Sequence, residues 1–595
     1  MASVLDPRKL QNVVKQGFIR ARHYRKARAM FIKAYVGQYY AKKYGLVGDE
    51  PINLIFHTIR ALIPNLIMKN PVNEVTTENV AHREYAYLMS LATDWIDRQI
   101  DLKEILRYGT VDACFGIGIF KTGLAQGGTM INFGDELIDQ GQVYTDNVDL
   151  DDYIFDPTCR KLRKAMFEGD RNRIPRQILL DDSQFNHDLV MKLPSSRHPD
   201  ATRKVEAIST SGMSNSEMIE LQDMVDVVEL FVPGADALIT IGDPEQIIMD
   251  DFLAAREYYG PKEGPYTKLA VTQPVPGNPL PIAPVGIWYD LHHVAGETMK
   301  KMVDQIKRQK DVAIVDPAGA DEAEDIRTSS DGDMVFGSPD TVKVVSFGGA
   351  NDKNVGAMSA LQTWYNYMSG NPDQMAGIAA GAKTATGQSI LQANQTVTIE
   401  DMRDMVYDCS AEINRKMAWY LHTDPLIDIP FSKRQPGGEY MQLQLTPEQK
   451  QGDFLEFTFT IKQRSMSRLD PAVRSKRIEM FATNIVPALA MTAQITMQMG
   501  IPFNLQEAIT DLARENDILD EVEDWFIDPT FMQRIQLQMS LGPQPAGKAS
   551  LNPKAVQQNG GSPMARKMMG PQGEQNQNFQ EGYPNQGQET FEGVR

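Results

Sequence analysis

Residues 377–384, Gly-Ile-Ala-Ala-Gly-Ala-Lys-Thr, come nearest in this sequence to a nucleotide-binding loop. Such a loop needs four residues between its glycines and a glycine directly before the lysine, so that backbone N–H groups surround the phosphates. Here three residues separate Gly377 from Gly381, and Ala382 precedes Lys383. No buried strand leads into the segment. We therefore exclude ATP binding at this loop, which leaves Lys383 as either a cation that touches passing phosphate or a solvated lysine.

Two other patterns could support metal or acid–base chemistry, and each has a simpler structural explanation. His292 and His293 are adjacent, so on a helix their side chains point about 100° apart and cannot chelate one metal well. An acidic cluster follows about thirty residues later, in what we expect to be an exposed loop. Clustered acids in such a loop usually form a solvated or partner-binding face. The cluster consists of Asp321, Glu322, Glu324 and Asp325.

The remaining glycine and cysteine patterns carry no catalytic or metal signature. Residues 115–120, Phe-Gly-Ile-Gly-Ile-Phe, lack the third glycine of GxGxxG and follow a helix, so they predict a strand with close-packed glycines. Cys114, Cys159 and Cys409 are too few and too far apart for a disulfide framework or a CxxC metal site. No Ser-His-Asp arrangement can be nominated without geometry. We expect no catalytic residue, metal or cofactor, and a protein that is not an enzyme.

Composition places the chain among ordinary globular proteins with several domains. It has 595 residues, of which 42% are hydrophobic and 23% charged. No apolar run is long enough to span a bilayer, and the first residues lack a signal-peptide core, so we expect folding in a reducing cytoplasm. The net charge of −18 argues against a protein that grips DNA over its whole surface. It suits an acidic wall along which DNA slides, but it is explained equally well by solubility.

Positive charge is concentrated in two places. The first 45 residues hold eleven Lys or Arg and one acid, Asp6, and their pattern predicts a basic amphipathic helix. This helix could bind nucleic acid, an anionic membrane, or an acidic neighbouring subunit, and the last is favoured because charge runs are usually paired or solvated. A second basic cluster suggests a salt-bridge surface between subunits, with DNA contact as the lesser alternative. It consists of Lys161, Arg163, Lys164, Arg171, Arg173 and Arg176.

The elements that position these residues follow a distinctive order between residues 285 and 421. A long helix is predicted over 287–310, with an apolar stripe from Trp288 to Ile306. Short strands follow at 311–315 and 341–347, and the chain returns as a helix over 352–368. A loop of small residues then leads into a third helix, 388–421. The order describes a protruding helical hairpin with a β-rich tip, which is not the layout of an enzyme core.

This order, together with the Thr-Ala-Thr-Gly-Gln-Ser-Ile phrase of residues 384–390, resembles the portal proteins of tailed bacteriophages. The resemblance covers about the middle two-thirds of the chain and depends on the order of elements, because no single motif in it is specific. It implies an α+β subunit with wing, stem, clip and helical crown. Such subunits assemble as a closed ring, implied to be a dodecamer, with an axial channel for double-stranded DNA.

The resemblance also implies a division of the chain. The expected parts are a basic N-terminal helical region (1–45), wing helices and strands (46–284), the first stem helix (285–311), the clip (312–349), the second stem helix (350–370), a channel loop (371–387), a long wing helix with strands (388–464), a helical crown (465–540) and a disordered C-terminal tail (541–595). The tail holds 29 Gly, Pro, Gln or Asn among 55 residues, too few apolar groups to offset its ordering entropy.

Three groups of site residues follow from the resemblance. The channel loop would touch DNA through Lys383, Thr384 and Thr386. Basic residues of the stem would be Lys300, Lys301, Lys307, Arg308 and Lys310. The acids Asp321, Glu322, Glu324 and Asp325 would lie on the clip, where partners dock.

Partners and location are likewise implied. Besides itself, the chain would bind the terminase large subunit, head–tail adaptors, and the major capsid and scaffolding proteins. DNA would pass non-specifically, no membrane would be spanned, and the protein would occupy the portal vertex of the virion. Two alternatives stay open: a nucleic-acid-processing enzyme with an unrecognised site, and a virion scaffold protein without a channel.

Elsewhere the pattern predicts a helix over 81–108 closed by Gly109, strands at 225–231 and 237–241, further strands within 426–462, and helices over 473–490, 493–499 and 504–525. Seven prolines between residues 259 and 284 exclude helix there.

Overall fold

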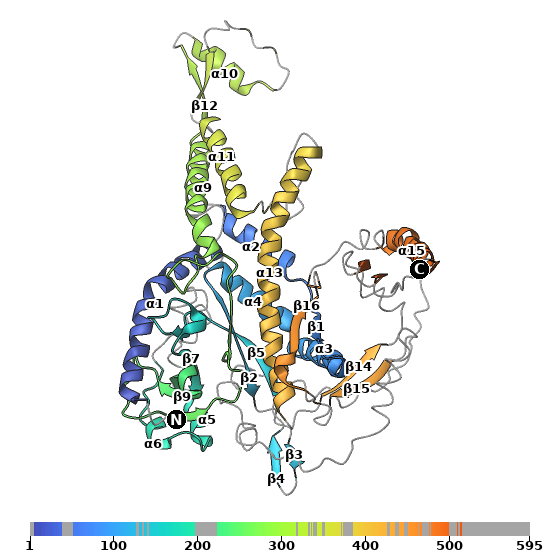
Figure 1. Ribbon diagram of the computed structural model, residues 1–595. Helices are drawn as coiled ribbons and strands as arrows, with labels where there is room; N and C mark the ends of the chain where they lie inside the picture. Colours follow the sequence, from blue (N-terminus) through green and yellow to red (C-terminus); the bar gives the residue numbers. More distant parts are fainter. Residues whose placement is uncertain are drawn as a thin grey trace, which may run out of the picture.

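A computed structural model of the chain describes residues 5–513 with interruptions, the longest at 38–51, 197–222 and 373–384. Helices and strands both contribute substantially, so the expected α+β class is confirmed. In Figure 1 the helices α9 (Pro284–Lys307) and α11 (Asp352–Ser369) project together from a mixed body, and a small strand-and-helix tip lies at their far end. We call the two projecting helices the stem. Within the described part of the chain, no helix is long and apolar enough to cross a membrane.

The N-terminal helix α1 (Pro7–Val36) begins and ends where its terminal residues dictate. The Asp6 carboxylate accepts hydrogen bonds from the backbone N–H groups of Arg8 and Lys9, and Pro7 occupies the first turn. Gly37 ends the helix with a φ of 58°. At about 1.5 Å per residue, its 30 residues make a rod about 45 Å long.

The other helices of the body are α2 (Leu54–Leu66), α3 (Arg83–Gln99), α4 (Leu102–Cys114) and the short α5 (Arg176–Asp181) and α6 (His187–Val190). The single helix expected over 81–108 is therefore wrong. Asp101 adopts a left-handed conformation (φ 48°) and separates α3 from α4.

Gly109 lies inside α4 and does not close a helix, because it is needed for close packing. A Cβ on Gly109 would lie 2.1 Å from Cζ of Phe120, and one on Gly118 would lie 2.2 Å from the carbonyl oxygen of Gly109. Only glycine permits this approach of the helix to strand β2. The predicted strand with close-packed glycines is thus confirmed, although it begins at Gly118.

Two antiparallel sheets form the strand layer of the body. The larger has the order β10-β9-β8-β7-β6, and the smaller has the order β11-β2-β5. Both strands expected around 225–241 are confirmed as the centre of the larger sheet. The bounds are β2 (Gly118–Ala125), β5 (Gln142–Val148), β6 (Tyr153–Phe155), β7 (Glu168–Pro175), β8 (Met224–Val232), β9 (Ala237–Gly242), β10 (Ala254–Glu257) and β11 (Tyr266–Leu269). Residues 259–283 contain β11 and no helix, as expected, and the last of the seven prolines, Pro284, begins helix α9.

A long helix, α13 (Ala385–Thr423), packs against elements from the first third of the chain. Its buried residues, including Ile413 and Met417, belong to the same core as α2, α3 and α4. Beside it, β1 (Asn73–Thr77) pairs with β16 (Phe457–Ile461), from Asn73 opposite Ile461 to Thr77 opposite Phe457. The sequence predicted β16 but not β1, whose Asn-Glu-Val-Thr-Thr sequence lacks a clear alternation.

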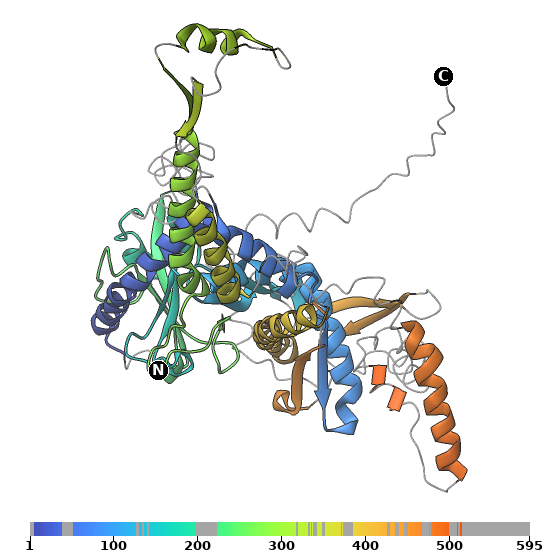
Figure 2. The same ribbon diagram turned by 90° about the horizontal axis from the view of Figure 1, so that it is seen from above.

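Smaller elements complete the described chain. They are the pairs β3 (Met130–Phe133) with β4 (Glu136–Asp139) and β14 (Ile429–Arg434) with β15 (Tyr440–Leu445), and the helix α15 (Val486–Gln498). The break expected between 490 and 493 is absent, since α15 runs through it, and Pro487 lies in its first turn. Most of the expected helix 504–525 and all of the expected tail 541–595 lie outside the described residues. Figure 2 shows α15 on the side of the body away from α1.

Candidate functional site

The stem consists of α9 (Pro284–Lys307) and α11 (Asp352–Ser369), and it is attached firmly to the body at its foot. The indole N–H of Trp288 donates to the carbonyl oxygen of Met368 (3.2 Å). The Tyr365 side chain is only 2% exposed, and its hydroxyl lies 2.8 Å from the Thr58 hydroxyl of α2. Burial raises the pKa of Tyr365 well above its ordinary value. The first contact joins the two stem helices to each other, and the second attaches α11 to the body.

The tip of the stem is built from two strands and a helix. β12 (Lys310–Val315) pairs with β13 (Val342–Phe347), and α10 (Ala320–Thr328) lies between them in the chain. The expectation of an exposed acidic loop is therefore wrong, because these acids lie on a helix. Asp321, Glu324 and Asp325 are exposed on α10, whereas the side chain of Glu322 lies outside the described residues.

The basic residues expected in the stem lie together just below the tip. Lys300, Lys301 and Lys307 are exposed on the last turns of α9, where positive charge complements the helix dipole. The helix ends slightly earlier than predicted, so Arg308 forms its cap and Lys310 begins β12. The stem thus has a basic end next to an acidic tip.

The exposed surface of α11 is almost free of charge. After Asp352 and Lys353 the helix contains no charged residue up to Ser369. Several of its large side chains are open to solvent: Trp364 is 60% exposed, Tyr367 83% and Met368 50%. Loss of charge and gain of aromatic residues are typical of the core of a protein–protein interface. This surface was not predicted from the sequence, although the absence of charged residues over 354–369 is a signal that could have revealed it.

The residues expected to contact DNA in the channel loop cannot be placed. Lys383 and Thr384 lie outside the described residues. Thr386 is in the first turn of α13, and its side chain is not among those described.

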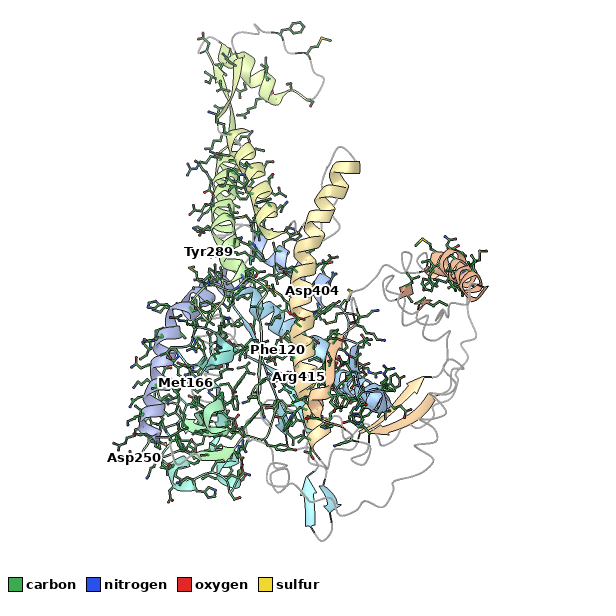
Figure 3. All side chains as sticks on the ribbon, in the orientation of Figure 1. Phe120, Met166, Asp250, Tyr289, Asp404 and Arg415 are labelled. Carbon is green, nitrogen blue, oxygen red and sulfur yellow. The ribbon has the colours of Figure 1, made fainter. Side chains whose placement is uncertain are left out.

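The two adjacent histidines diverge as expected. His292 is buried, with 1% exposure, at the foot of the stem. The exposed His293 lies 3.4 Å from Glu297 and stacks on Tyr289, with ring centroids 6.3 Å apart. Figure 3 places Tyr289 where the stem meets the body. Within the described residues, no group of three or more His, Cys, Asp or Glu side chains could hold a metal ion.

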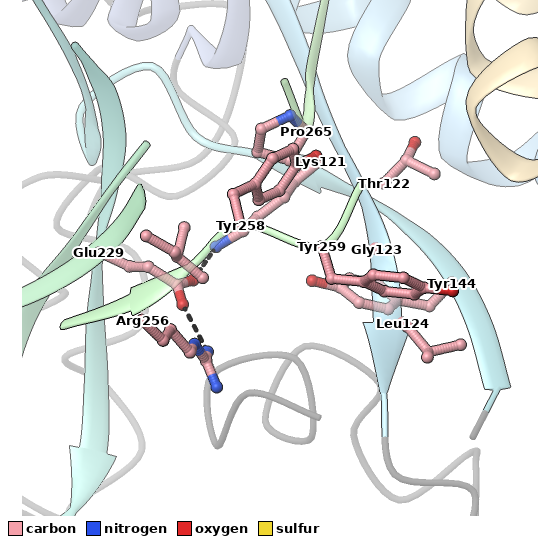
Figure 4. A pocket seen from close by; sticks show the side chains of 11 residues that line it. Lys121, Thr122, Gly123, Leu124, Tyr144, Glu229, Arg256, Tyr258, Tyr259 and Pro265 are labelled. Carbon is pink, nitrogen blue, oxygen red and sulfur yellow. Dashed lines mark hydrogen bonds and ion pairs between the residues drawn. The ribbon is translucent and has the colours of Figure 1, made fainter. Parts of the chain in front are cut away.

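A small internal cavity of about 60 Å³ lies between the two sheets and is shown in Figure 4. Lys121 Nζ lies 2.6 Å from both Asp170 Oδ1 and Glu229 Oε2, and Arg256 reaches the other oxygen of Glu229 at 3.3 Å. Burial alone would lower the pKa of Lys121, but the two carboxylates outweigh it and raise this pKa. Lys121 lies on a strand of the smaller sheet and both carboxylates lie on strands of the larger one, so this network joins the two sheets.

A larger open groove of about 760 Å³ lies between α2 and α4. Apolar side chains such as Phe56 and Ile63 line it, together with Arg60, Lys103 and Glu104. Among the described residues that line this groove, no acid and base are hydrogen-bonded to each other. The groove is therefore a surface feature without an assigned reaction.

Many basic residues on the body are neutralised by acids of the same chain. Arg28 of α1 is buried with Asp112, Asp149 and Asp151 at 2.9–3.2 Å. Burial alone would lower the pKa of Arg28, but these acids raise it. We expected the basic helix to pack on acids of a neighbouring subunit. At Arg28 the acids belong to the body of the same chain.

The second basic cluster divides in the same way. Arg171 pairs with Asp152, Asp243 and Glu245, at distances of 3.1–3.4 Å. Arg173 pairs with Asp226 and Arg176 with Asp223. We expected this cluster to form salt bridges between subunits. For these three residues that expectation is wrong, because their partners lie within the same chain.

Comparison with known proteins adds no identification. The sequence matches no family model, and no curated protein matches it significantly.

Proposed function

We propose that this chain is the subunit of a phage portal, a closed ring at one capsid vertex through which double-stranded DNA is packaged and later ejected. The role is structural and mechanical, not catalytic. The supporting order of elements is helix, strand–helix–strand tip, helix, and long helix, with the first two helices projecting from the body as a stem. In this reading α9 and α11 are the stem helices, and the tip is the clip.

The observation that carries the proposal is the bare, uncharged surface of α11. An isolated subunit leaves Trp364, Tyr367 and Met368 in water on a projecting helix. Contiguous exposed apolar surface usually marks a binding site, and a second copy of the same helical hairpin can cover it. Repeating one such contact between different faces of identical subunits forms a ring when the rotation closes.

The proposed partners follow from the same arrangement. The exposed acids of α10 would contribute to a docking surface for the terminase large subunit during packaging and for head–tail adaptors afterwards. The basic end of α9 would make a few weak phosphate contacts, because many strong ones would stop DNA from moving. Capsid and scaffolding proteins would contact the body.

Native mass spectrometry of the purified chain tests the proposal. We expect one large species of about twelve subunits that persists on dilution. A protein that remains a monomer at high concentration would contradict the proposal.

A further inference from the structure

The inward face of α1 is fully used within the chain. Val14 and Phe18 are buried in the core formed with β8 and β9, and Gln11 exchanges two hydrogen bonds with the backbone of Met249. Phe18 is also held between the guanidinium groups of Arg25 and Arg171, 5.0 and 4.8 Å from its ring centroid. The helix is therefore docked rigidly, and the apolar side that contains Val14 and Phe18 is not available to a partner. Three apolar side chains elsewhere on α1, Val13, Ile19 and Met30, are 39–45% exposed.

The outward face of α1 carries cations along its length. Arg20, Lys26 and Lys33 are exposed. Lys26 and Lys33 are seven residues apart, so they lie almost in line and about 10 Å apart along the helix axis, whereas Arg20 lies about 120° around the helix from Lys26. The exposed side chains of Asn12 and Gln16 continue this face toward the N-terminus. No acid follows Asp6 in this helix, and no ion pair is found for these three cations in the part of the chain that the structure describes.

Residues 157–164 bring the remainder of the second basic cluster to this face. Arg20 reaches the carbonyl oxygen of Pro157 at 3.5 Å, and Tyr24 packs in the same apolar cluster as Leu162. Four basic residues of this segment are exposed: Arg160, Lys161, Arg163 and Lys164. Arg163 is paired with Glu412 at 3.2 Å. We call Arg20, Lys26, Lys33, Arg160, Lys161 and Lys164 the outer basic face.

In Figures 1 and 2, α1 lies along the outer edge of the body, away from the tip of the stem. Arg20 thus lies beside residues 157–164, which are more than a hundred residues away in sequence, and Lys26 and Lys33 extend the exposed positive charge farther along α1. Because many other basic residues of the body are neutralised within the chain, this surface stands out on a protein with a net charge of −18.

We propose that the outer basic face binds duplex nucleic acid through its phosphates, without reading its sequence and at a place separate from the proposed channel. The face is rich in lysine and amide side chains and poor in aromatic residues. Lysine binds phosphate as a point charge, whereas it is depleted from protein–protein interfaces, which favour aromatic residues and arginine. Lys26 and Lys33, in line on a rigid helix, and the cations beside Arg20 can contact separate phosphates of a duplex.

A lipid surface is a weaker match for the same charges. An amphipathic helix binds a bilayer by inserting its apolar face, but that face of α1 is packed on the sheet. An acidic protein partner would use the same cations, and the experiment below separates it from nucleic acid.

The test uses the full-length protein and a covalently closed circular plasmid, which cannot thread through a closed ring. Binding is measured by gel mobility shift between 50 and 200 mM salt. The variant combines Arg20→Gln, Lys26→Gln and Lys33→Gln. We expect the wild type to bind the circle, and the variant to bind about tenfold more weakly or worse, with a salt slope reduced by about 0.9 for each cation removed.

A matched control removes the same charge elsewhere, by Arg83→Gln, Lys103→Gln and Arg107→Gln on α3 and α4. It should bind within about threefold of wild type. The melting temperature of each variant shows whether it remains folded, which we expect because all six side chains are at least partly exposed.

Three results would overturn the inference: no binding of the circle by wild type, equal losses in both variants, or, in parallel binding assays, binding only to vesicles that contain phosphatidylserine or to polyglutamate. Failure here leaves the proposed ring untouched, since ring formation is measured without DNA. Conversely, a monomer that binds the circle would retain this inference and contradict the ring.

Discussion

Replacing Trp364 by alanine should weaken assembly without weakening the subunit. The side chain is 60% exposed in the single chain and does not belong to the more buried stripe of α11, represented by Leu361 and Tyr365. Exposed substitutions of this kind change the free energy of unfolding by less than about 0.5 kcal/mol. The stability of the isolated subunit should therefore remain at the wild-type level.

The effect on assembly follows from the area that Trp364 has left to bury. About 150 Å² of the side chain is exposed, and covering it is worth about 3–4 kcal/mol at about 25 cal/mol per Å². Because alanine still covers part of this area, we expect a loss of about 2–3 kcal/mol at each interface. This weakens each subunit contact by about 30- to 150-fold.

Sedimentation velocity over a concentration series measures the loss, and thermal unfolding of the dissociated protein measures the stability. Tyr108→Ala, which removes an exposed aromatic residue from α4, is the matched control and should assemble like wild type. An unchanged association midpoint for Trp364→Ala would refute the assignment of α11 to the interface. A large fall in melting temperature would show that Trp364 supports the fold itself.

Three further predictions concern the body. Lys121→Met leaves Asp170 and Glu229 buried without their shared cation, so urea unfolding should show that the free energy of unfolding falls by about 3–5 kcal/mol. The exposed control Lys161→Met should lower it by less than about 1 kcal/mol. An equally small loss for Lys121→Met would contradict the network. Burial raises the pKa of Asp97 well above its ordinary value and raises that of Asp94 to about 6. The folded protein therefore holds these protons more tightly than the unfolded chain does. Their contribution to the free energy of unfolding is fully present at low pH and is lost as pH rises through the raised pKa values. Asp97→Asn should therefore flatten the fall in melting temperature as pH rises from about 4, the ordinary pKa of an aspartate, and an unaltered pH profile would argue against a neutral Asp97. Gly118→Ala should destabilise the fold by about 1–3 kcal/mol or more, because its Cβ would lie 2.2 Å from the carbonyl oxygen of Gly109. Gly234→Ala is the control, since a Cβ there meets nothing within 4 Å. Equal melting temperatures of the two variants would contradict this packing.

The order of elements between residues 285 and 421 could be predicted because each element carries a strong local signal. The stem helices have apolar stripes of helical period, and the strands at the tip are rich in β-branched residues. Their observed bounds differ from the predicted ones by at most about three residues. The acidic helix α10 was missed because its short, charged sequence has no buried stripe to reveal it.

Features that depend on distant partners were not predictable in this way. Gly109 was expected to end a helix, but its role is set by Phe120 and Gly118 on a neighbouring strand. β1 has little strand character of its own and is formed through pairing with β16, almost 400 residues away. The basic clusters were recognised from sequence, yet which cations are neutralised and which remain free depends on acids far along the chain.

Negative-stain electron microscopy of the purified full-length protein, with class averages viewed down any symmetry axis, tests the proposed ring most directly. We expect closed rings with a central hole wide enough for duplex DNA. Compact particles without a hole would contradict the portal assignment, and nuclease and ATPase assays of the same preparation would then be the next measurements.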